Sequence, residues 1–251
     1  MTRILGGDGN SRSDGVKKHM KRLPAPRSWA IPRKTHFWTV KPAPGPHPAE
    51  RSVPIGIILR DMLKVCDSAR EARSILNTRG VLVDGRITTN PKFPVGFMDV
   101  LSLQETKAHY RMTVNTRGRM TLVPVDESEA KWKLCRIEDK TTVRGGKTQL
   151  NLHDGRNILL PKDQYKTGTT LKIALPGQKV LAAYDLAPGA ASLIAGGQHV
   201  GELGHVLDVF LTRNPRSNTV TFKEGFSTDV DKVFVVGKEA SELKLPEAPA
   251  L

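Results

Sequence analysis

The stretch that decides the fold reads SAREARSILNTRGVLVDGR and covers residues 68–86. Ser68 and Glu71 have the spacing of a capping box, in which each side chain satisfies a backbone N–H at the start of a helix. Four apolar residues then recur on one helix face and predict its buried side: Ala69, Ala72, Ile75 and Leu76. Gly80 fits the position just after the last turn, because glycine readily adopts a positive φ. A short amphipathic helix is therefore expected.

Three arginines project from this helix, and a fourth projects from the hairpin that follows. The run VLV at 81–83 is a short strand, and Asp84-Gly85 is typical of a two-residue hairpin turn. Guanidinium groups donate paired hydrogen bonds to phosphate oxygens, so this rigid platform indicates contact with a phosphate backbone. The four are Arg70, Arg73, Arg79 and Arg86. The alternative is a solvated helix face, but Glu71 serves the cap and does not face its chain neighbour, which leaves the arginines free.

The flanking residues extend the stretch into a small α/β unit, which we place at residues 52–105. Apolar residues before the stretch recur at helical spacing: Ile55, Ile58, Leu59, Met62 and Leu63. The run VGFMDVLSL at 95–103 predicts a further strand. Two helices packed on a small sheet are therefore expected.

The charge of the chain favours a polyanionic partner. The net charge is +14 over 251 residues, and chains this basic commonly bind nucleic acid. The charge is uneven by segment, being +8 in 1–51, +2 in 52–104, +6 in 105–175 and −2 in 176–251. The first two thirds should carry the basic surface, and the C-terminal part is expected to face protein or solvent.

Residues 1–51 are predicted to form an extended, basic N-terminal arm. Prolines such as those of PAPGPHP at 42–48 oppose regular helix and sheet. Aromatic and basic side chains are interleaved: Trp29, Phe37 and Trp38 with Arg27, Arg33 and Lys34. Two interpretations stay open, namely rings that dock on the next domain, and an arm that lies on RNA with its cations on phosphates. The second is favoured.

After residue 105 the helical period fades and short strands are expected. Three runs carry the strand pattern: 170–175, 219–223 and 233–236. We divide this part into a central β-domain, a barrel and a mobile tail, at 106–175, 176–240 and 241–251. Arg117 and Arg119 flank Gly118 in a predicted turn that either contacts RNA or is solvated.

Other functional classes are disfavoured. Cys66 and Cys135 are far apart and lack a His/Cys cluster, so no metal site is expected and both should be core residues. No apolar run approaches the roughly 18 residues of a membrane span. Phosphate-loop and dinucleotide fingerprints are absent, and the seven histidines are scattered. We expect no enzyme, no cofactor and no small-molecule substrate.

A family resemblance emerges when these motifs are combined. The segments LRDML (59–63), SAREAR (68–73) and VDG (83–85) make residues 55–103 similar to the S-four RNA-binding domain. Three further segments resemble those of one family, the archaeal and eukaryotic e-type small-subunit ribosomal protein four: 16–29, 94–103 and 129–137. The loop at 186–206 resembles the KOW motif of SH3-like barrels.

The resemblance implies an α+β multidomain fold with four parts. They are an extended basic N-terminal arm, a small α/β S-four RNA-binding domain, a central β-domain and a C-terminal KOW SH3-like β-barrel. It also implies a structural constituent of the small ribosomal subunit in the cytoplasm, bound to the 5′ domain of small-subunit rRNA and to neighbouring ribosomal proteins. The runner-up is a free RNA-binding regulator that uses the same modules.

The residues expected to carry this function are basic side chains and loop glycines. RNA contact is assigned to Lys17, Lys18, Lys21, Arg22, Arg27, Arg33, Lys34, Arg60, Arg70, Arg73, Arg79, Arg86, Arg117, Arg119, Lys131 and Lys133. Tight turns and close approach to a partner in the KOW-like loop are assigned to Gly196, Gly197, Gly201 and Gly204.

Overall fold

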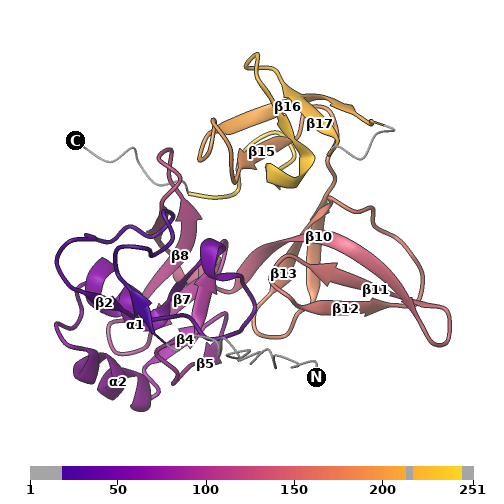
Figure 1. Ribbon diagram of the computed structural model, residues 1–251. Helices are drawn as coiled ribbons and strands as arrows, with labels where there is room; N and C mark the ends of the chain where they lie inside the picture. The colour runs from indigo at the N-terminus through magenta and orange to yellow at the C-terminus, as the bar shows by residue number, and fades with distance from the viewer. Residues whose placement is uncertain (1–18, 213–216, 245–251) are drawn as a thin grey trace, which may run out of the picture.

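The computed structural model describes residues 19–212 and 217–244. Three five-stranded antiparallel sheets follow one another along the chain and occupy three lobes (Figure 1). Lys17, Lys18 and most of the predicted tail lie outside the described residues. Within the described part, no helix is long and apolar enough to cross a membrane.

The first lobe is built on the stretch at 68–86. Helix α2 (Ala69–Asn77) begins at the predicted capping box, where Ser68 Oγ accepts a hydrogen bond from the Glu71 N–H at 3.2 Å. The sheet has the order β5-β4-β7-β8-β9, and the short pair β3-β6 lies beside it. The strands are β3 (Ser52–Pro54), β4 (Val81–Val83), β5 (Arg86–Ile87), β6 (Pro94–Gly96), β7 (Val100–Leu103), β8 (Ala108–Val114) and β9 (Met120–Val125). The sheet thus continues across residue 105, the predicted end of the S-four unit.

The first lobe differs from the sequence predictions in local detail. The predicted first helix is present as α1 (Ile55–Ile57) with a π-helical continuation at Ile58–Met62. The single strand predicted at 95–103 is wrong, because Met98 has a φ of +68° and breaks it into β6 and β7. The sequence predicts a positive φ at Gly80, but the residue that adopts it after α2 is Arg79, at +59°. Gly80 is the next residue and does not have a positive φ.

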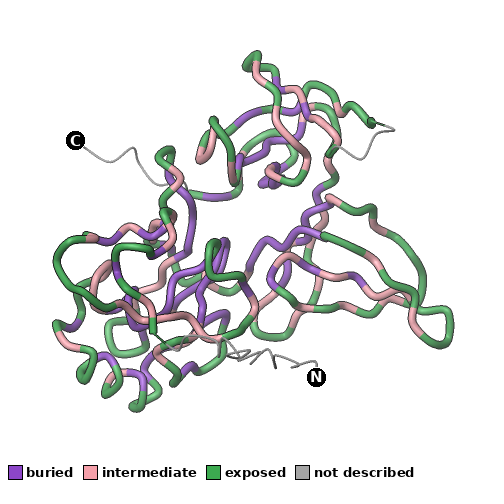
Figure 2. Tube along the Cα trace, viewed as in Figure 1, coloured by how far each residue is buried: buried purple, intermediate pink, exposed green. Residues whose placement is uncertain are grey.

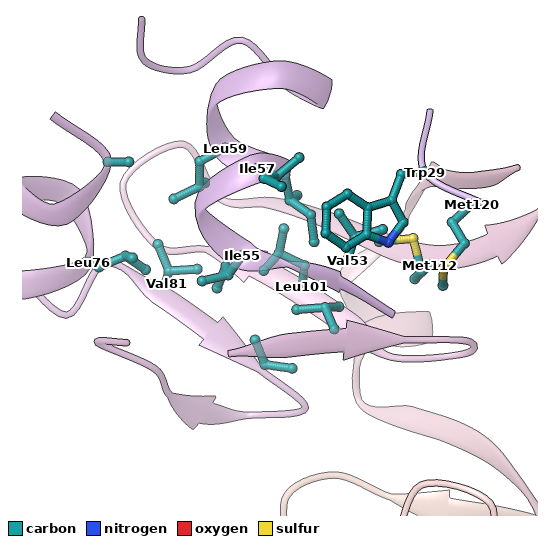
Figure 3. Close-up of a cluster of buried hydrophobic side chains, with 14 of the residues drawn as sticks. Trp29, Val53, Ile55, Ile57, Leu59, Leu76, Val81, Leu101, Met112 and Met120 are labelled. Atoms are coloured by element: carbon teal, nitrogen blue, oxygen red, sulfur yellow. The ribbon is translucent and has the colours of Figure 1, made fainter. Parts of the chain in front are cut away.

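The N-terminal arm folds back on the first lobe in the described residues. Strands β1 (Met20–Lys21) and β2 (Trp38–Thr39) pair with each other, and Trp29 forms a parallel bridge with Met120. The Trp29 side chain is 1% exposed, its Nε1–H donates to the Ser52 carbonyl at 2.7 Å, and it lies in the hydrophobic core (Figure 3). For Trp29, docking on the next domain is therefore the correct interpretation.

The second lobe is organised by β10 (Trp132–Val143), which follows the single turn of α3 (Glu127–Ala130). The first half of β10 pairs with β13 and the second half with β11, in a sheet of order β12-β11-β10-β13-β14. The other strands are β11 (Lys147–Leu152), β12 (Asn157–Leu160), β13 (Thr170–Ala174) and β14 (Val180–Tyr184). The strand predicted at 170–175 is thus confirmed as β13.

The third lobe is an open sheet of order β18-β17-β16-β15-β19. Its strands are β15 (Ala191–Ile194), β16 (Leu203–Phe210), β17 (Thr219–Phe222), β18 (Ser227–Asp229) and β19 (Val233–Gly237), with a 3-10 turn at Val230–Lys232. In the described residues the edge strands β18 and β19 do not pair with each other, so the sheet forms a half-barrel. The predicted strands at 219–223 and 233–236 are confirmed as β17 and β19.

The buried residues gather where the three lobes approach one another, while the far ends of β11 and β12 are exposed (Figure 2). One hydrophobic cluster lies in the arm and the first lobe, and one lies in the second lobe. The remaining cluster contains the core of the third lobe together with side chains of the other two, such as Met98 and Leu134, so it joins the three lobes. Cys66 and Cys135 are both buried and free, as predicted.

Candidate nucleic-acid interface

Four exposed cations lie on the outer face of α2, in the turn just after it and in the adjoining hairpin. The side chains of Arg70, Arg73, Arg79 and Arg86 have no hydrogen-bond or ion-pair partner among the described residues. Glu71 does not neutralise them, since its carboxylate accepts the backbone N–H groups of Asp67 at 3.0 Å and Ser68 at 3.4 Å. These hydrogen bonds lower the pKa of Glu71. The arginines are therefore held on a rigid element and left free for a ligand, as the sequence predicted.

A basic groove of about 200 Å³ runs between α2 and the β1–β2 hairpin of the arm. Arg73 of α2, Arg60 of the preceding helix and Lys92 of the loop before β6 line it together with Trp38 of β2. Asp61 anchors the Arg60 guanidinium at 2.7 and 3.2 Å. Lys92 could not be predicted from the sequence, because a single lysine in a loop carries no periodic or motif signal.

A second basic hollow, of about 450 Å³, lies where the arm meets β9 and contains Arg27, Arg33 and Arg119. The Arg33 guanidinium donates to the carbonyls of Leu23, Ala25 and Pro26 at 2.6–3.0 Å, so it braces the arm. Arg27 and Arg119 are exposed. Their positions on the surface suit contact with phosphates.

The predicted basic turn between β8 and β9 is well formed. Asn115 Oδ1 accepts the backbone N–H groups of Arg117 and Arg119, both at 3.0 Å, in an Asx-type turn. Gly118 has a φ of +71°, which glycine adopts without strain. The turn therefore presents both arginine side chains to solvent.

Two of the assigned cations are not available to a ligand. Lys133 is 0% exposed, and its Nζ lies 2.5 Å from Asp99, 2.8 Å from Asp154 and 2.9 Å from Asp84. Arg22 is also 0% exposed and donates to Asp61 at 2.9 Å and to the Pro32 carbonyl at 2.6 Å. The prediction of RNA contact is therefore wrong for Lys133 and Arg22, because both cations are buried and their hydrogen-bond partners lie inside the fold.

The Lys133 cluster sets the protonation of its neighbours. Burial opposes ionisation of Asp99 and Asp154, but the Lys133 ammonium outweighs it, so the pKa of Asp99 falls below its usual range and that of Asp154 falls to about 2. Burial and the neighbouring Asp99 instead raise the pKa of Asp84. A second cation, Arg156, reaches Asp84 at 2.7 Å and Asp154 at 3.1 Å. This cluster joins the first and second lobes and is structural in character.

The remaining assigned cations are on the surface with differing degrees of constraint. Lys34 is exposed. Lys21 lies 5.1 Å from the centroid of the Phe37 ring. Lys131 pairs with Glu127 at 2.9 Å, one turn away on α3, an arrangement that weakens its attraction for a phosphate.

One group of side chains has the composition of a metal site, namely Cys135, His153 and Asp154. The two ring nitrogens of His153 are already engaged, since Nδ1 accepts the Arg136 N–H and Nε2 faces the Phe97 carbonyl, both at 3.2 Å. Burial and the Lys133 ammonium lower the pKa of His153 to about 3. Because Lys133 occupies the Asp154 carboxylate as well, these donors do not fit a metal ion.

The glycines of the KOW-like loop provide close approach within the chain. A Cβ on Gly201 would lie 2.4 Å from the Asn115 carbonyl carbon, so the loop packs against the basic turn between β8 and β9. A Cβ on Gly204 would lie 2.6 Å from the Phe222 ring. Gly197 has a φ of +100°, and Gly196 has a conformation open to other residues.

Comparison with known families divides the chain into three matches. Residues 14–50 match the model described as the RS4NT domain, residues 57–101 match the S4 domain, and residues 106–180 match ribosomal family S4e. The matched S4 segment contains α2 and the hairpin with their free arginines.

Curated relatives and a solved structure agree with these matches. The small ribosomal subunit protein eS4 of Methanothermobacter thermautotrophicus is 48% identical over 92% of this chain and 96% of its own length. The eS4 protein of Staphylothermus marinus is 45% identical over 93% and 97%. The crystal structure of 30S ribosomal protein S4e from Thermoplasma acidophilum covers 75% of this chain and 96% of its own, at 35% identity and a TM-score of 0.67.

The exposed cations on an S4 fold define an RNA-binding protein of the S4-domain class. The relationship to eS4 proteins extends over nearly the whole length of both chains. The chain belongs to the eS4 family of small ribosomal subunit proteins. These relatives are small ribosomal subunit proteins, and no enzyme family is indicated.

Proposed function

We propose that this chain binds the 5′ domain of small-subunit rRNA and stabilises its fold during assembly and translation. The observation that carries the proposal is the set of arginines on α2 and its hairpin, exposed and without partners among the described residues. The arm hollow with Arg27 and Arg119 and the turn with Arg117 provide further cations on the same lobe. In the ribosome of the cytoplasm, neighbouring small-subunit proteins are the expected partners of the slightly acidic third lobe.

The physical basis is charge neutralisation by a preformed surface. Each Lys or Arg that contacts a phosphate releases condensed counterions, so affinity falls with rising salt in proportion to the number of contacts. Folded modules recognise RNA largely through its shape and backbone, and rigid placement of the cations on α2 suits that mode. The runner-up, a free regulator with the same modules, differs by not staying with small subunits on a high-salt sucrose gradient.

The test of the proposal is the salt dependence of binding to the transcribed 5′ domain. We expect the double variant Arg70→Ala, Arg73→Ala to bind more weakly and to flatten the plot of log K against log salt by about one to two units, since each lost phosphate contact removes roughly 0.7–0.9. The matched control is Arg144→Ala, Lys147→Ala, which removes two exposed cations from the distant β10–β11 hairpin. An unchanged slope in the first variant, or an equal change in the control, would contradict the role of α2.

A further inference from the structure

The arm contains two exposed aromatic residues that the hydrophobic core does not use. Trp38 is 55% exposed and Phe37 is 62% exposed, in contrast to the buried Trp29. Phe37 meets the indole edge-on, at 4.8 Å between centroids and 86° between planes, and His19 lies 5.8 Å away at 57°. Neither ring is stacked parallel on the indole, and more than half of the Trp38 surface is exposed, which leaves it available for stacking.

The indole lies in the basic groove and not on an isolated stretch of surface. Arg60, Arg73 and Lys92 line the same groove as Trp38. A planar apolar group beside cations is the combination that takes one nucleotide, because the base stacks on the ring while flanking phosphates meet the cations. The groove, at about 200 Å³, is smaller than the roughly 300–1,000 Å³ of small-molecule sites.

The groove is also fixed before any ligand arrives. Asn90 Oδ1 accepts the Lys92 N–H at 3.0 Å, and the Lys92 carbonyl accepts the Ala43 N–H at 2.8 Å. Trp38 is held opposite Lys21 in the β1–β2 pair. Arg73 is placed by the capped helix α2. The backbone positions from which the ring and the cations project are therefore set.

We infer that Trp38 stacks on an unpaired base of the bound RNA, with Arg73 and Lys92 on the phosphates beside it. The inference rests on the proposed function and makes it more specific: the RNA at this groove is a bulge, loop or junction nucleotide and not a continuous duplex. Bases in a duplex are stacked on one another and offer no free face to a side chain.

The first experiment measures affinity for the transcribed 5′ domain together with tryptophan emission. Trp38→Leu is expected to bind about 5- to 150-fold more weakly, the range found for loss of one base–aromatic stack, and Trp38→Phe to keep most of the affinity. RNA should quench the emission of the wild type and not that of Trp38→Leu, because Trp29 is buried and Trp132 is already covered by Arg111 and Lys172. Phe210→Leu, an exposed aromatic of the third lobe, is the matched control.

The second experiment works even if the Trp38 variants fold poorly. Ultraviolet crosslinking of the wild-type chain to the RNA should join Trp38 to one unpaired nucleotide, and an abasic site there should weaken wild-type binding by about 5- to 150-fold. Wild-type affinity in Trp38→Leu, together with no quenching of the wild-type emission by RNA, would overturn the inference. Failure of the wild type to bind the 5′ domain at all would instead refute the proposed function.

Discussion

Lys133 shows how a single residue changes meaning once its surroundings are known. In the sequence it belongs to the basic run KWK at 131–133 and suggests a surface cation. In the fold its ammonium is the shared partner of three carboxylates, which come from the turns after β4, before β7 and after β11. Removing one member of a buried charge cluster leaves the others uncompensated, which is costlier than the net value of the cluster.

Lys133→Met is therefore expected to lower the free energy of unfolding by about 3–5 kcal/mol at neutral pH, as measured by urea denaturation. The pH dependence has a definite sign. In the wild type the depressed pKa values of Asp99 and Asp154 give stability that is present above the pKa of an unfolded aspartate and is lost as pH falls through the folded values. Without the ammonium the pKa values of Asp99 and Asp154 rise, so protonation of these carboxyl groups should stabilise the folded state of the variant.

The difference in free energy of unfolding between the wild type and Lys133→Met should accordingly become smaller as the pH is lowered from about 7 toward 4. Lys131→Met is the control, because that lysine is exposed and pairs with Glu127 on the surface. A constant difference in free energy of unfolding across this pH range would show that the pKa values of the carboxylates do not depend on Lys133.

Trp29 and Trp38 provide a second contrast at the residue scale. Trp29→Ala should destabilise the first lobe by about 3–5 kcal/mol, the range for deleting a buried aromatic side chain, and Trp38→Ala should change stability by about 0.5 kcal/mol or less. The measurement is denaturant unfolding followed by far-ultraviolet circular dichroism. Comparable losses in the two variants would contradict the different burial of these side chains.

At the scale of elements, the KOW-like loop is defined by backbone geometry. Gly201 combines a φ of +80° with a Cβ position that overlaps the Asn115 backbone. Gly225 has a similar φ of +89° with nothing within 4 Å of its Cβ position, and Gly196 has neither constraint. These three glycines separate backbone strain from steric overlap.

Gly225→Ala should cost about 1–2 kcal/mol from the left-handed conformation alone, and Gly201→Ala should add about 1–3 kcal/mol from overlap. Gly196→Ala should have little effect. Thermal unfolding of the three variants gives the order, and equal effects at Gly201 and Gly225 would show that the loop yields without cost. Gly201→Ala should also loosen the contact between the loop and Asn115, and so increase hydrogen exchange in the turn that carries Arg117.

Elements also show what local sequence can predict. The capping box of α2 and the hairpin at Asp84-Gly85 were predicted correctly, because their determinants lie within four residues of one another. The break at Met98 was missed, because VGFMDVLSL has an apolar strand pattern throughout. The Asp99 side chain explains the break, since its carboxylate accepts the Gly96 N–H at 2.7 Å and closes a turn.

At the scale of the whole molecule, Arg136 links the second lobe to the third. Its Nη1 donates to the carbonyls of Asp231 and Val233, both at 2.8 Å, and lies 3.3 Å from the Val230 carbonyl. Its other nitrogens are held by Glu138. One guanidinium thus satisfies backbone acceptors at the start of β19.

Arg136→Lys keeps the charge but loses the planar fork, and Arg136→Ala loses both. Since each abandoned buried acceptor costs about 1–3 kcal/mol, we expect faster amide exchange in residues 230–237 in both variants, with the larger effect in Arg136→Ala. The amides of α2 should exchange as in the wild type. Uniform acceleration over all three lobes would mean that Arg136 supports global folding and not this one junction.

The candidate RNA surface has one part that the sequence predicts and another part that only the fold creates. The exposed cations of α2, of its hairpin and of the basic turn at 117–119 were identified from the sequence, because turn and helix periodicity place them outside any local core. The groove between Trp38 and Arg73 was not, because β2 and α2 meet only after the arm folds back. Arg22 and Lys133 were assigned to RNA for the same reason, since their carboxylate partners lie 21–49 residues away.

The amino-acid order alone established the basic character of the chain, its S4 helix and hairpin, and its family resemblance, since charge, capping and turn formation depend on residues close together in the chain. The fold alone determined which cations stay on the surface, which tryptophan stacks in the core and which faces the groove, and how the lobes are joined. These depend on burial and on hydrogen bonds between distant segments, and the energy of a charge changes most when water is removed from around it.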